Sequence, residues 1–240
     1  MNLCIDQGNT YTKIGIFEAE NLLHTALFSR VKKEDFLQIT NEYRIKKVII
    51  SSVQKTDSDL RSLLESKTSG YMELSHTSAI PIKNLYETPE TLGKDRLAGV
   101  IGATSLHPKK DILVIDAGTA LTFDFINKKS EYLGGSISPG LHMRIKALHT
   151  FTQKLPLVHN EGPYTLLARN TEQAIRSGVI NGICFEIDAY INELQKTYPE
   201  LLIFLTGGDC FFFESKLKNR IFANQNLVLI GLNRIINYNA

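Results

Sequence analysis

Apolar and alternating runs follow one another in the same order in two parts of the chain. Residues 3–5 and 112–115 are apolar, and each run leads through a glycine turn into an alternating run, residues 13–17 and 121–125. A short apolar run between turn residues predicts a buried strand, and alternation predicts a strand with one covered face. The pattern therefore predicts strand, tight turn and strand, twice in one chain.

The rest of the chain alternates helix and strand in each part. Strands are predicted at residues 2–6, 11–17, 22–28, 47–52, 71–74, 111–116, 120–127, 131–137, 201–205 and 227–230. Helices are predicted at residues 34–43, 58–67, 96–105, 141–150, 171–197 with interruptions at Gly178 and Gly182, 215–221, and at the end of the chain. This repeated order indicates an α/β fold of two duplicated units. We expect the units to be residues 1–108 and 109–240, joined near residues 107–110 and facing each other across a cleft.

Both glycine turns carry the same residue types. The first is Asp6-Gln7-Gly8-Asn9-Thr10, with Lys13 beyond it, and the second is Asp116-Ala117-Gly118-Thr119-Ala120. Glycine lets backbone amides approach a phosphate, threonine adds a hydroxyl donor, and an aspartate at a strand end can hold a cation. An ordinary hairpin turn explains one copy equally well, because Gly, Asn and Asp dominate turns. The second copy, with a third glycine turn at residues 206–209, favours a nucleotide held between two related halves.

The cluster Gly93-Lys94-Asp95-Arg96 allows two interpretations. It fits the start of a solvated helix, where aspartate is favoured in the first turn. It also fits an acceptor site in which Asp95 accepts a hydroxyl proton and Arg96 binds a carboxylate through two hydrogen bonds. Farther along, Asn170 or Thr171 is expected to cap a helix.

Composition narrows the class of protein. The 240 residues are 43% hydrophobic and carry a net charge of +2, without a long block of one sign, so no nucleic-acid or anionic-membrane partner is indicated. No apolar run reaches bilayer-spanning length, and the charge of Asp6 comes too early for a signal peptide. The three cysteines lack metal-ligand spacing, so buried free thiols in a reducing cytoplasm are expected. The sequence has no P-loop, dinucleotide-turn or nucleophile-elbow pattern.

In this order the motifs resemble those of type III pantothenate kinase, a bacterial family of the actin-like and sugar-kinase ATPase superfamily. The resemblance covers most of the chain, and the ordered set is far more specific than any single motif. It rests on Asp6-x-Gly-Asn-Thr-x-x-Lys13, Ser51-Ser52-Val53, Tyr86-x-x-Pro89, Leu92-Gly-Lys-Asp-Arg96, Asp116-Ala-Gly-Thr-Ala-Leu-Thr122, Gly134-Gly-Ser-Ile-Ser-Pro-Gly140, Asn170-Thr171 and Thr206-Gly-Gly-Asp209.

The resemblance implies duplicated ribonuclease-H-like units of the actin-like ATPase kind. It implies ATP-dependent phosphorylation of the primary hydroxyl of pantothenate, the first step of coenzyme A synthesis. It further implies a monovalent cation, potassium or ammonium, alongside magnesium with ATP. The expected protein is a cytoplasmic homodimer with no nucleic-acid or membrane partner.

The residue roles that the resemblance implies form three sets. Asp95 is the catalytic proton acceptor, and Asp116 holds the monovalent cation. The ATP-binding set is Asp6, Gln7, Gly8, Asn9, Thr10, Tyr11, Thr12, Lys13 and Thr119, and the pantothenate-binding set is Tyr86, Gly93, Lys94, Asp95, Arg96 and Thr171, the last across a dimer interface. Lys94 departs from the family, which often has a small residue there.

Two other functions stay open at this point. Some relatives of the family are described as accessory factors in transcription, which allows a non-catalytic regulatory homologue. A kinase of the same superfamily with a different acceptor is the other alternative. The intact Asp6, Asp95, Arg96 and Asp116 favour a catalytic protein, because a regulatory one has no chemical need of them.

Overall fold

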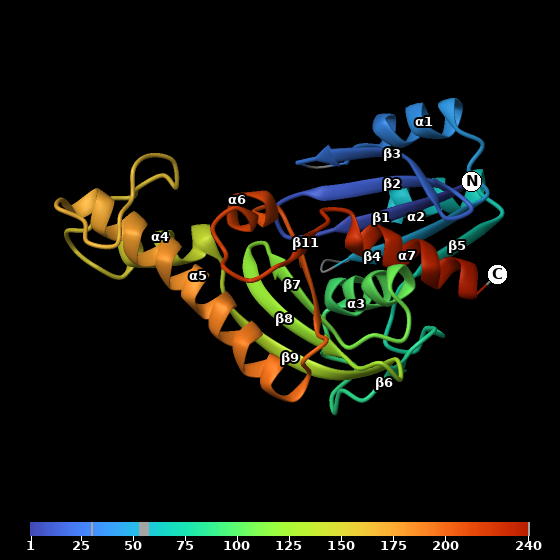
Figure 1. The fold of residues 1–240 in the computed structure, drawn as a ribbon. Helices are drawn as coiled ribbons and strands as arrows, with labels where there is room; N and C mark the ends of the chain where they lie inside the picture. The colour runs from blue at the N-terminus through green and yellow to red at the C-terminus, as the bar shows by residue number, and fades with distance from the viewer. Residues whose placement is uncertain (30, 53–57, 240) are drawn as a thin grey trace. The chain divides into compact units, whose positions relative to one another are not determined.

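The computed structural model describes residues 1–29, 31–52 and 58–239 (Figure 1). The chain divides into two compact units, each of which is described by itself. Unit 1 comprises residues 1–109, 126–134 and the segment from residue 226 onward, and unit 2 comprises residues 110–125 and 135–225. Val53 of the motif Ser51–Val53 lies outside the described residues. The expected junction near residues 107–110 and the proposed duplicated halves remain predictions.

Unit 1 is built on a five-stranded sheet. Its strand order is β3-β2-β1-β4-β5, in which β1 pairs antiparallel with β2 and parallel with β4. The β2–β3 pair is antiparallel and the β4–β5 pair is parallel. The strands are β1 (Asn2–Gln7), β2 (Thr12–Glu18), β3 (Asn21–Phe28), β4 (Lys47–Ser52) and β5 (Gly70–Glu73).

The two faces of this sheet are covered by different helices, because successive strand residues point to opposite faces. Leu3 and Ile5 of β1 lie in a buried cluster with Phe36 of α1 (Lys33–Glu42) and Leu64 of α2 (Ser58–Lys67). On β2, Gly15 faces the other way, toward a leucine of α7 (Leu227–Tyr238), which packs against β1 and β4.

Two glycines allow α7 to pack closely against α3 (Lys94–Leu106). A Cβ on Gly231 would overlap the backbone carbonyl oxygen of Ala98, and a Cβ on Gly102 would overlap that of Leu227. Helix backbones approach this closely only where side chains are missing from the contact. The pair fixes α3, whose first turn contains Asp95, on the core of unit 1.

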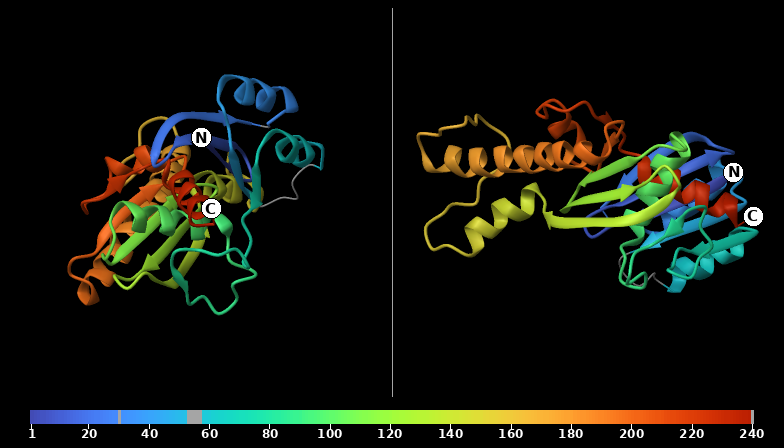
Figure 2. Two further views of the ribbon diagram at one scale, coloured as in Figure 1. Left: turned by 90° about the vertical axis from the view of Figure 1, so that its right-hand side faces the viewer. Right: turned by 60° about the horizontal axis from the view of Figure 1, so that its bottom comes forward.

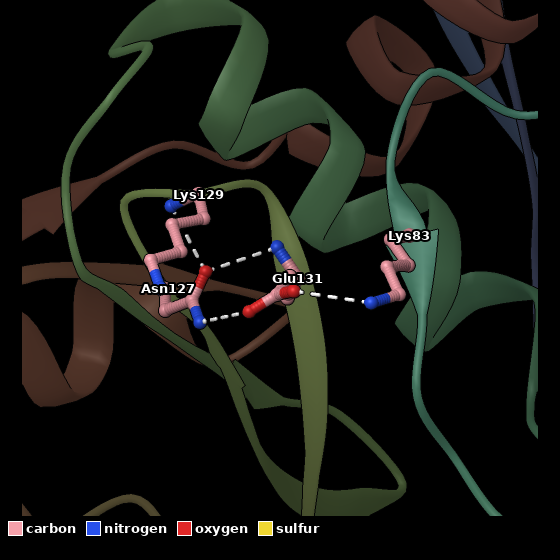
Figure 3. A network of polar contacts seen from close by, with 4 residues as sticks. All are labelled: Lys83, Asn127, Lys129 and Glu131. Atoms are coloured by element: carbon pink, nitrogen blue, oxygen red, sulfur yellow. Dashed lines mark hydrogen bonds and ion pairs between the residues drawn. The ribbon is translucent and has the colours of Figure 1, made fainter.

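A short strand that the sequence pattern did not predict, β6 (Lys83–Asn84), pairs parallel with Glu131 and Tyr132, the first residues of β9 (Glu131–Pro139). Figure 3 shows the polar network at this pair. Asn127 Oδ1 accepts hydrogen bonds from the backbone N–H of Lys129 (2.9 Å) and of Glu131 (3.0 Å). The Glu131 carboxylate accepts from Asn127 Nδ2 (2.9 Å) and from Lys83 Nζ (3.3 Å), and these hydrogen bonds lower its pKa. The network closes the turn that leads into β9.

Unit 2 has its own run of paired strands. The order is β11-β10-β7-β8-β9, and β10 pairs in parallel with both β7 and β11. The strands are β7 (Ile112–Ala117), β8 (Ala120–Ile126), β10 (Leu202–Thr206) and β11 (Phe222–Ala223), with β9 passing from unit 1 into unit 2 after Gly134. The helices are α4 (Leu141–Thr150), α5 (Thr171–Thr197) and α6 (Cys210–Glu214).

The core of unit 2 lies between this sheet and α5. Ile183 and Ile187 of α5 share a buried cluster with Leu113 and Phe123 of the sheet, and the Phe123 ring stacks on Tyr190 at 4.1 Å. Figure 2 shows α4 and the first half of α5 running side by side, with the connecting segment of residues 151–170 beside them.

Three predicted elements are wrong. Residues 227–230, predicted as a strand, are the first turn of α7, because a four-residue apolar run has the same appearance in a strand and a buried helix. Residues 215–221, predicted as a helix, contain none, and the helix α6 lies just before them. Buried Asp188 accepts hydrogen bonds from the backbone N–H groups of Lys218 and Asn219, which occupies donors that a helix would need.

The third correction concerns α5, which continues through Gly178 and Gly182 without interruption. Buried residues before, between and after the two glycines, among them Ile175, Ile180 and Ile187, pack on the core of unit 2. Each glycine costs a helix about 1 kcal/mol relative to alanine, and burial of an apolar side chain contributes more than that. Packing therefore outweighs the local preference.

Candidate functional site

The first glycine turn joins β1 to β2 in unit 1. Asp6 and Gln7 end β1, Thr12 and Lys13 begin β2, and the Gly8 backbone N–H donates to the Tyr11 carbonyl oxygen at 3.0 Å. Thr12 is buried, whereas Asn9, Thr10 and Tyr11 are exposed, so the tip of the turn faces solvent. Gln7 is held by a hydrogen bond that its side-chain oxygen accepts from Ser52 Oγ at 2.9 Å.

Asp6 interacts electrostatically with a residue about 90 positions away. Burial, followed by the charge of Asp95 at the start of α3, raises the pKa of Asp6 to about 7, and the charge of Lys13 opposes this rise. Asp6 and Lys13 are register partners in the β1–β2 pair. The structure thus brings together two carboxylates and an ammonium group that were predicted as parts of one site.

Asp95 and Arg96 lie in the first turn of α3, after Gly93 at the N-cap. Asp95 Oδ1 accepts a hydrogen bond from the Arg96 backbone N–H at 2.8 Å, and a Cβ on Gly93 would come within 2.5 Å of that oxygen. Gly93 therefore makes room for the carboxylate. Lys94, the first residue of the helix, is half-buried. The carboxylate thus stabilises the helix start and at the same time lies near Asp6.

Arg96 is packed against an aromatic side chain. The residue is 8% exposed, and its guanidinium carbon lies 5.8 Å from the centroid of the Tyr86 ring. Tyr86 in turn stacks on Tyr132 at 6.1 Å and lies over Gly134, whose φ of 108° favours glycine. Tyr86 and Arg96, predicted from separate motifs, are therefore neighbours. Gly134 has no side chain and so leaves room for the Tyr86 ring above it.

The second glycine turn joins β7 to β8 in unit 2. The Gly118 backbone N–H donates to the Ala120 carbonyl oxygen at 3.1 Å, two residues on, whereas Gly8 in the first turn donates to Tyr11, three residues on. The Asp116 carboxylate lies against two glycines: a Cβ on Gly118 would come within 2.9 Å of its Oδ1, and a Cβ on Gly207 would overlap it. Gly207, with φ of 90°, belongs to the third glycine turn, so the second and third turns meet at Asp116.

Two further contacts hold these turns in place. The Asp209 backbone N–H donates to the Ala117 carbonyl oxygen at 2.9 Å. The Gly140 backbone N–H donates to the Thr119 carbonyl oxygen at 3.1 Å, and a Cβ on Gly140 would overlap the Gly118 carbonyl oxygen. The segment before α4 is thus pressed against the second glycine turn, which explains why glycine is required there.

One titratable pair of unit 2 lies at the third glycine turn. His142 Nε2 lies 3.9 Å from Asp209 Oδ1, and burial raises the pKa of Asp209 although His142 opposes this. Across the described ranges, no group of three or more His, Cys, Asp or Glu could hold a metal ion. Cys4, Cys184 and Cys210 are buried, as expected.

Thr171 is exposed and is the first residue of α5. Asn170 is the cap, because its Oδ1 accepts a hydrogen bond from the Gln173 backbone N–H at 2.9 Å. The helices of the described part of the chain include none long and apolar enough to cross a bilayer.

Comparison with known proteins gives the family. A family model described as type III pantothenate kinase matches residues 2–193. A type III pantothenate kinase of Phocaeicola vulgatus is 49% identical over 239 residues, covering 100% of this chain and 99% of that protein. Proteins of the same name from Cytophaga hutchinsonii and Christiangramia forsetii are 47% and 44% identical, covering 100% of this chain and 100% and 99% of theirs.

Solved structures show the fold. A Baf family protein from Campylobacter jejuni, named for transcriptional activation, aligns with a TM-score of 0.62 at 23% identity, covering 99% of this chain and 98% of that one. A glucokinase from an Antarctic psychrotroph aligns with a TM-score of 0.50 at 11% identity, covering 100% and 99%. The predicted α/β fold of the actin-like and sugar-kinase class is confirmed. Because the family model spans most of the sequence and several full-length relatives exceed 40% identity, the chain belongs to the type III pantothenate kinase family.

Proposed function

We propose that this protein transfers the γ-phosphoryl group of ATP to the primary hydroxyl of pantothenate, the first step of coenzyme A synthesis. Family membership supports the reaction. The observation that carries it is the grouping of Asp6, Lys13 and Asp95 in unit 1, beside a glycine turn with an exposed tip. An ATP-consuming biosynthetic reaction also fits the cytoplasm.

The proposed ATP contacts follow from the chemistry of the turns. Phosphoryl transfer needs positioning and neutralisation of charge more than covalent help from the protein. The backbone amides of residues 8–10 approach the phosphates in unit 1, and Lys13 adds a positive charge. Thr119 contacts ATP from unit 2. A carboxyl whose pKa is about 7 carries only part of a negative charge at neutral pH, so Asp6 repels phosphate less than an ordinary aspartate would.

The proposed acceptor contacts come from the start of α3. Asp95 aligns the hydroxyl of pantothenate and accepts its proton as the bond to phosphorus forms. The planar guanidinium of Arg96 binds the carboxylate at the other end of the substrate. Tyr86, held over Gly134 and against Arg96, forms an apolar wall for the chain between these ends. Thr171 completes the substrate contacts.

Asp116 is the candidate ligand for a monovalent cation. Its carboxylate lies against the backbone of Gly118 and Gly207, where any larger residue would fill the space. Potassium or ammonium bound there would place a positive charge at the second glycine turn. Magnesium belongs to the ATP substrate, which binds it through its phosphates.

We further propose a homodimer formed through α5. A groove along this helix is lined by residues 166–168 and by small residues that include Ala174, Gly178 and Gly182. Leu166 and Leu167 are 72% and 85% exposed, and a Cβ on Gly178 would meet nothing within 4 Å. A surface that combines exposed leucines with small helix residues suits close packing against a second copy of the same helix. Thr171 begins this helix and would then act on the partner's substrate.

The alternatives have weaker support. Transcriptional activation is the description of a Campylobacter jejuni protein that shares the fold at 23% identity, and the glucokinase likewise shares only the fold. A non-catalytic homologue would give no ATP consumption with pantothenate. A kinase for another acceptor would consume ATP with that acceptor and leave pantothenate unchanged.

A coupled ATP-consumption assay, with and without pantothenate and in potassium or sodium buffer, tests the proposal directly. We expect pantothenate-dependent turnover that is higher in potassium. Asp95→Asn keeps the size of the side chain but cannot accept the proton, so kcat should fall about 10²- to 10⁴-fold with ATP binding nearly intact. Thermal melting is measured alongside, because Asp95 also supports the helix start. A variant that melts lower and turns over normally would exclude Asp95 as the base.

A further inference from the structure

Three elements of unit 2 meet at Arg144, a residue that no sequence motif singled out. Its guanidinium forms an ion pair with Glu186 of α5 and donates through Nη2 to Ser138 Oγ of β9 at 3.0 Å. Its Nε donates to the Pro139 carbonyl oxygen at 2.7 Å. Ser138 Oγ in turn donates to Glu186 Oε1 at 2.6 Å. One side chain of α4 therefore ties the end of β9 to the middle of α5.

The segment that Arg144 holds is the one pressed against the second glycine turn. Pro139 precedes Gly140, whose backbone N–H donates to the Thr119 carbonyl oxygen at 3.1 Å. Because a Cβ on Gly140 would overlap the Gly118 carbonyl oxygen, the two backbones are in direct contact. A shift of Pro139 would therefore move the turn that carries Asp116 and Thr119.

The chemistry of this cluster suits positioning. The Arg144 and Glu186 side chains are 22% and 24% exposed, so solvent weakens their interaction less than it would on an open surface. The planar guanidinium serves three acceptors in fixed directions, which a flexible ammonium group cannot reproduce. The segment meets the turn through the backbone of Gly140.

We infer that Arg144 is a positioning residue for the nucleotide, which acts by holding residues 139–140 against the Asp116–Thr119 turn. The inference rests on the proposed function, since it takes that turn to contact ATP. In this chain of contacts, Glu186 holds the Arg144 guanidinium and Arg144 holds the Pro139 carbonyl. The neighbouring Gly140 then holds Thr119. If the Arg144–Glu186 ion pair served stability alone, its loss would lower the melting temperature and leave the affinity for nucleotide unchanged.

The test compares Arg144→Met with Lys146→Met, which removes an exposed positive charge from the same helix. Dissociation constants are measured directly for a non-hydrolysable ATP analogue, and KM values for ATP and pantothenate in the coupled assay. We expect Arg144→Met to weaken analogue binding about 10- to 100-fold, as misplaced contacts commonly do, with the pantothenate KM within about twofold of wild type. Lys146→Met should match wild type.

A charge swap separates positioning from stability. Arg144→Glu combined with Glu186→Arg restores an ion pair between α4 and α5, but a glutamate cannot donate to the Pro139 carbonyl. The melting temperature should recover in the swap while analogue affinity stays low. Wild-type affinity in Arg144→Met, or recovered affinity in the swap, would overturn the inference. Should Arg144→Met not fold, Arg144→Lys provides the same comparison. We expect it to bind the ATP analogue more weakly than wild type, and an unchanged affinity would contradict the inference.

Failure of the proposed function gives a different result. If wild type binds the ATP analogue and does not phosphorylate pantothenate, the acceptor assignment is wrong and the binding comparison still tests Arg144. If wild type does not bind the analogue, the proposed function and the role of Arg144 are both wrong.

Discussion

Asp6 is an acid whose surroundings oppose its ionisation. Burial and the nearby Asp95 raise its pKa from 3.8 to about 7, and Lys13 compensates only in part. A carboxyl with a raised pKa in the folded state binds a proton there that the unfolded chain has already released. Folding stability from this group is therefore present at low pH and is lost as pH rises between about 4 and 7.

We predict that Asp6→Asn flattens the pH dependence of stability in the ligand-free protein. Binding of one proton changes the free energy of unfolding by at most about 1.4 kcal/mol per pH unit within that window. Chemical denaturation at pH 5, 6 and 7 measures the slope for wild type and variant. Identical slopes would mean that Asp6 titrates as an ordinary aspartate.

Arg96 is buried against Tyr86, and its proposed ligand is the pantothenate carboxylate. We predict that Arg96→Ala raises the pantothenate KM about 10- to 100-fold, because a hydrogen bond to a charged group contributes about 1.5–3 kcal/mol. Arg96→Lys keeps the charge without the planar guanidinium, so its pantothenate KM should lie between those of wild type and Arg96→Ala. The coupled assay gives KM and kcat separately. Loss of kcat with an unchanged KM would place Arg96 elsewhere in the reaction.

At the scale of elements, the contact between α3 and α7 depends on glycine. A Cβ on Gly231 would overlap the Ala98 carbonyl oxygen, whereas a Cβ on Gly178 of α5 would meet nothing within 4 Å. We predict that Gly231→Ala destabilises the protein by about 1–3 kcal/mol through overpacking. Gly178→Ala is the matched control; at a protein concentration below that at which the proposed dimer forms, it should be neutral or up to about 1 kcal/mol stabilising, because alanine favours helix. Denaturant titration measures both changes, and equal effects would contradict the packing argument.

Most elements could be predicted from the periodicity of the chain, and the failures have physical causes. The run at residues 227–230 is too short to distinguish a strand from a buried helix, and the helix that forms packs its Gly231 closely against Ala98 of α3. The helix predicted at residues 215–221 does not form where Asp188, about 30 residues away, accepts hydrogen bonds from the backbone. Such long-range partners leave no local pattern.

The candidate functional site shows the same difference between local sequence patterns and long-range contacts. Both glycine turns and the Asp95–Arg96 pair could be found from the sequence, because turn chemistry is local. The grouping of Tyr86 with Gly134, and of Ser138 with Arg144 and Glu186, depends on tertiary packing between separate elements. Spacing in the sequence contains no signal for either group.

At the scale of the whole molecule, the groove on α5 is the proposed contact with a second copy. We predict that Gly178→Arg, which places a large charged side chain in this groove, yields monomers with a near-normal melting temperature and little activity. Glu193→Arg changes an exposed residue farther along the same helix and serves as the control. Sedimentation or light scattering gives the mass. A Gly178→Arg dimer with full activity would exclude the groove as the interface.

The close packing of α3 on α7 also bears on how the protein is made. Roughly 120 residues separate the two helices in the chain. At about 5–20 residues per second, a ribosome needs on the order of 6–24 s to synthesise that stretch. Throughout this interval the face of α3 that packs on α7 stays uncovered, while the segments of unit 2 emerge. The core of unit 1 can therefore be completed only after α7 has been synthesised.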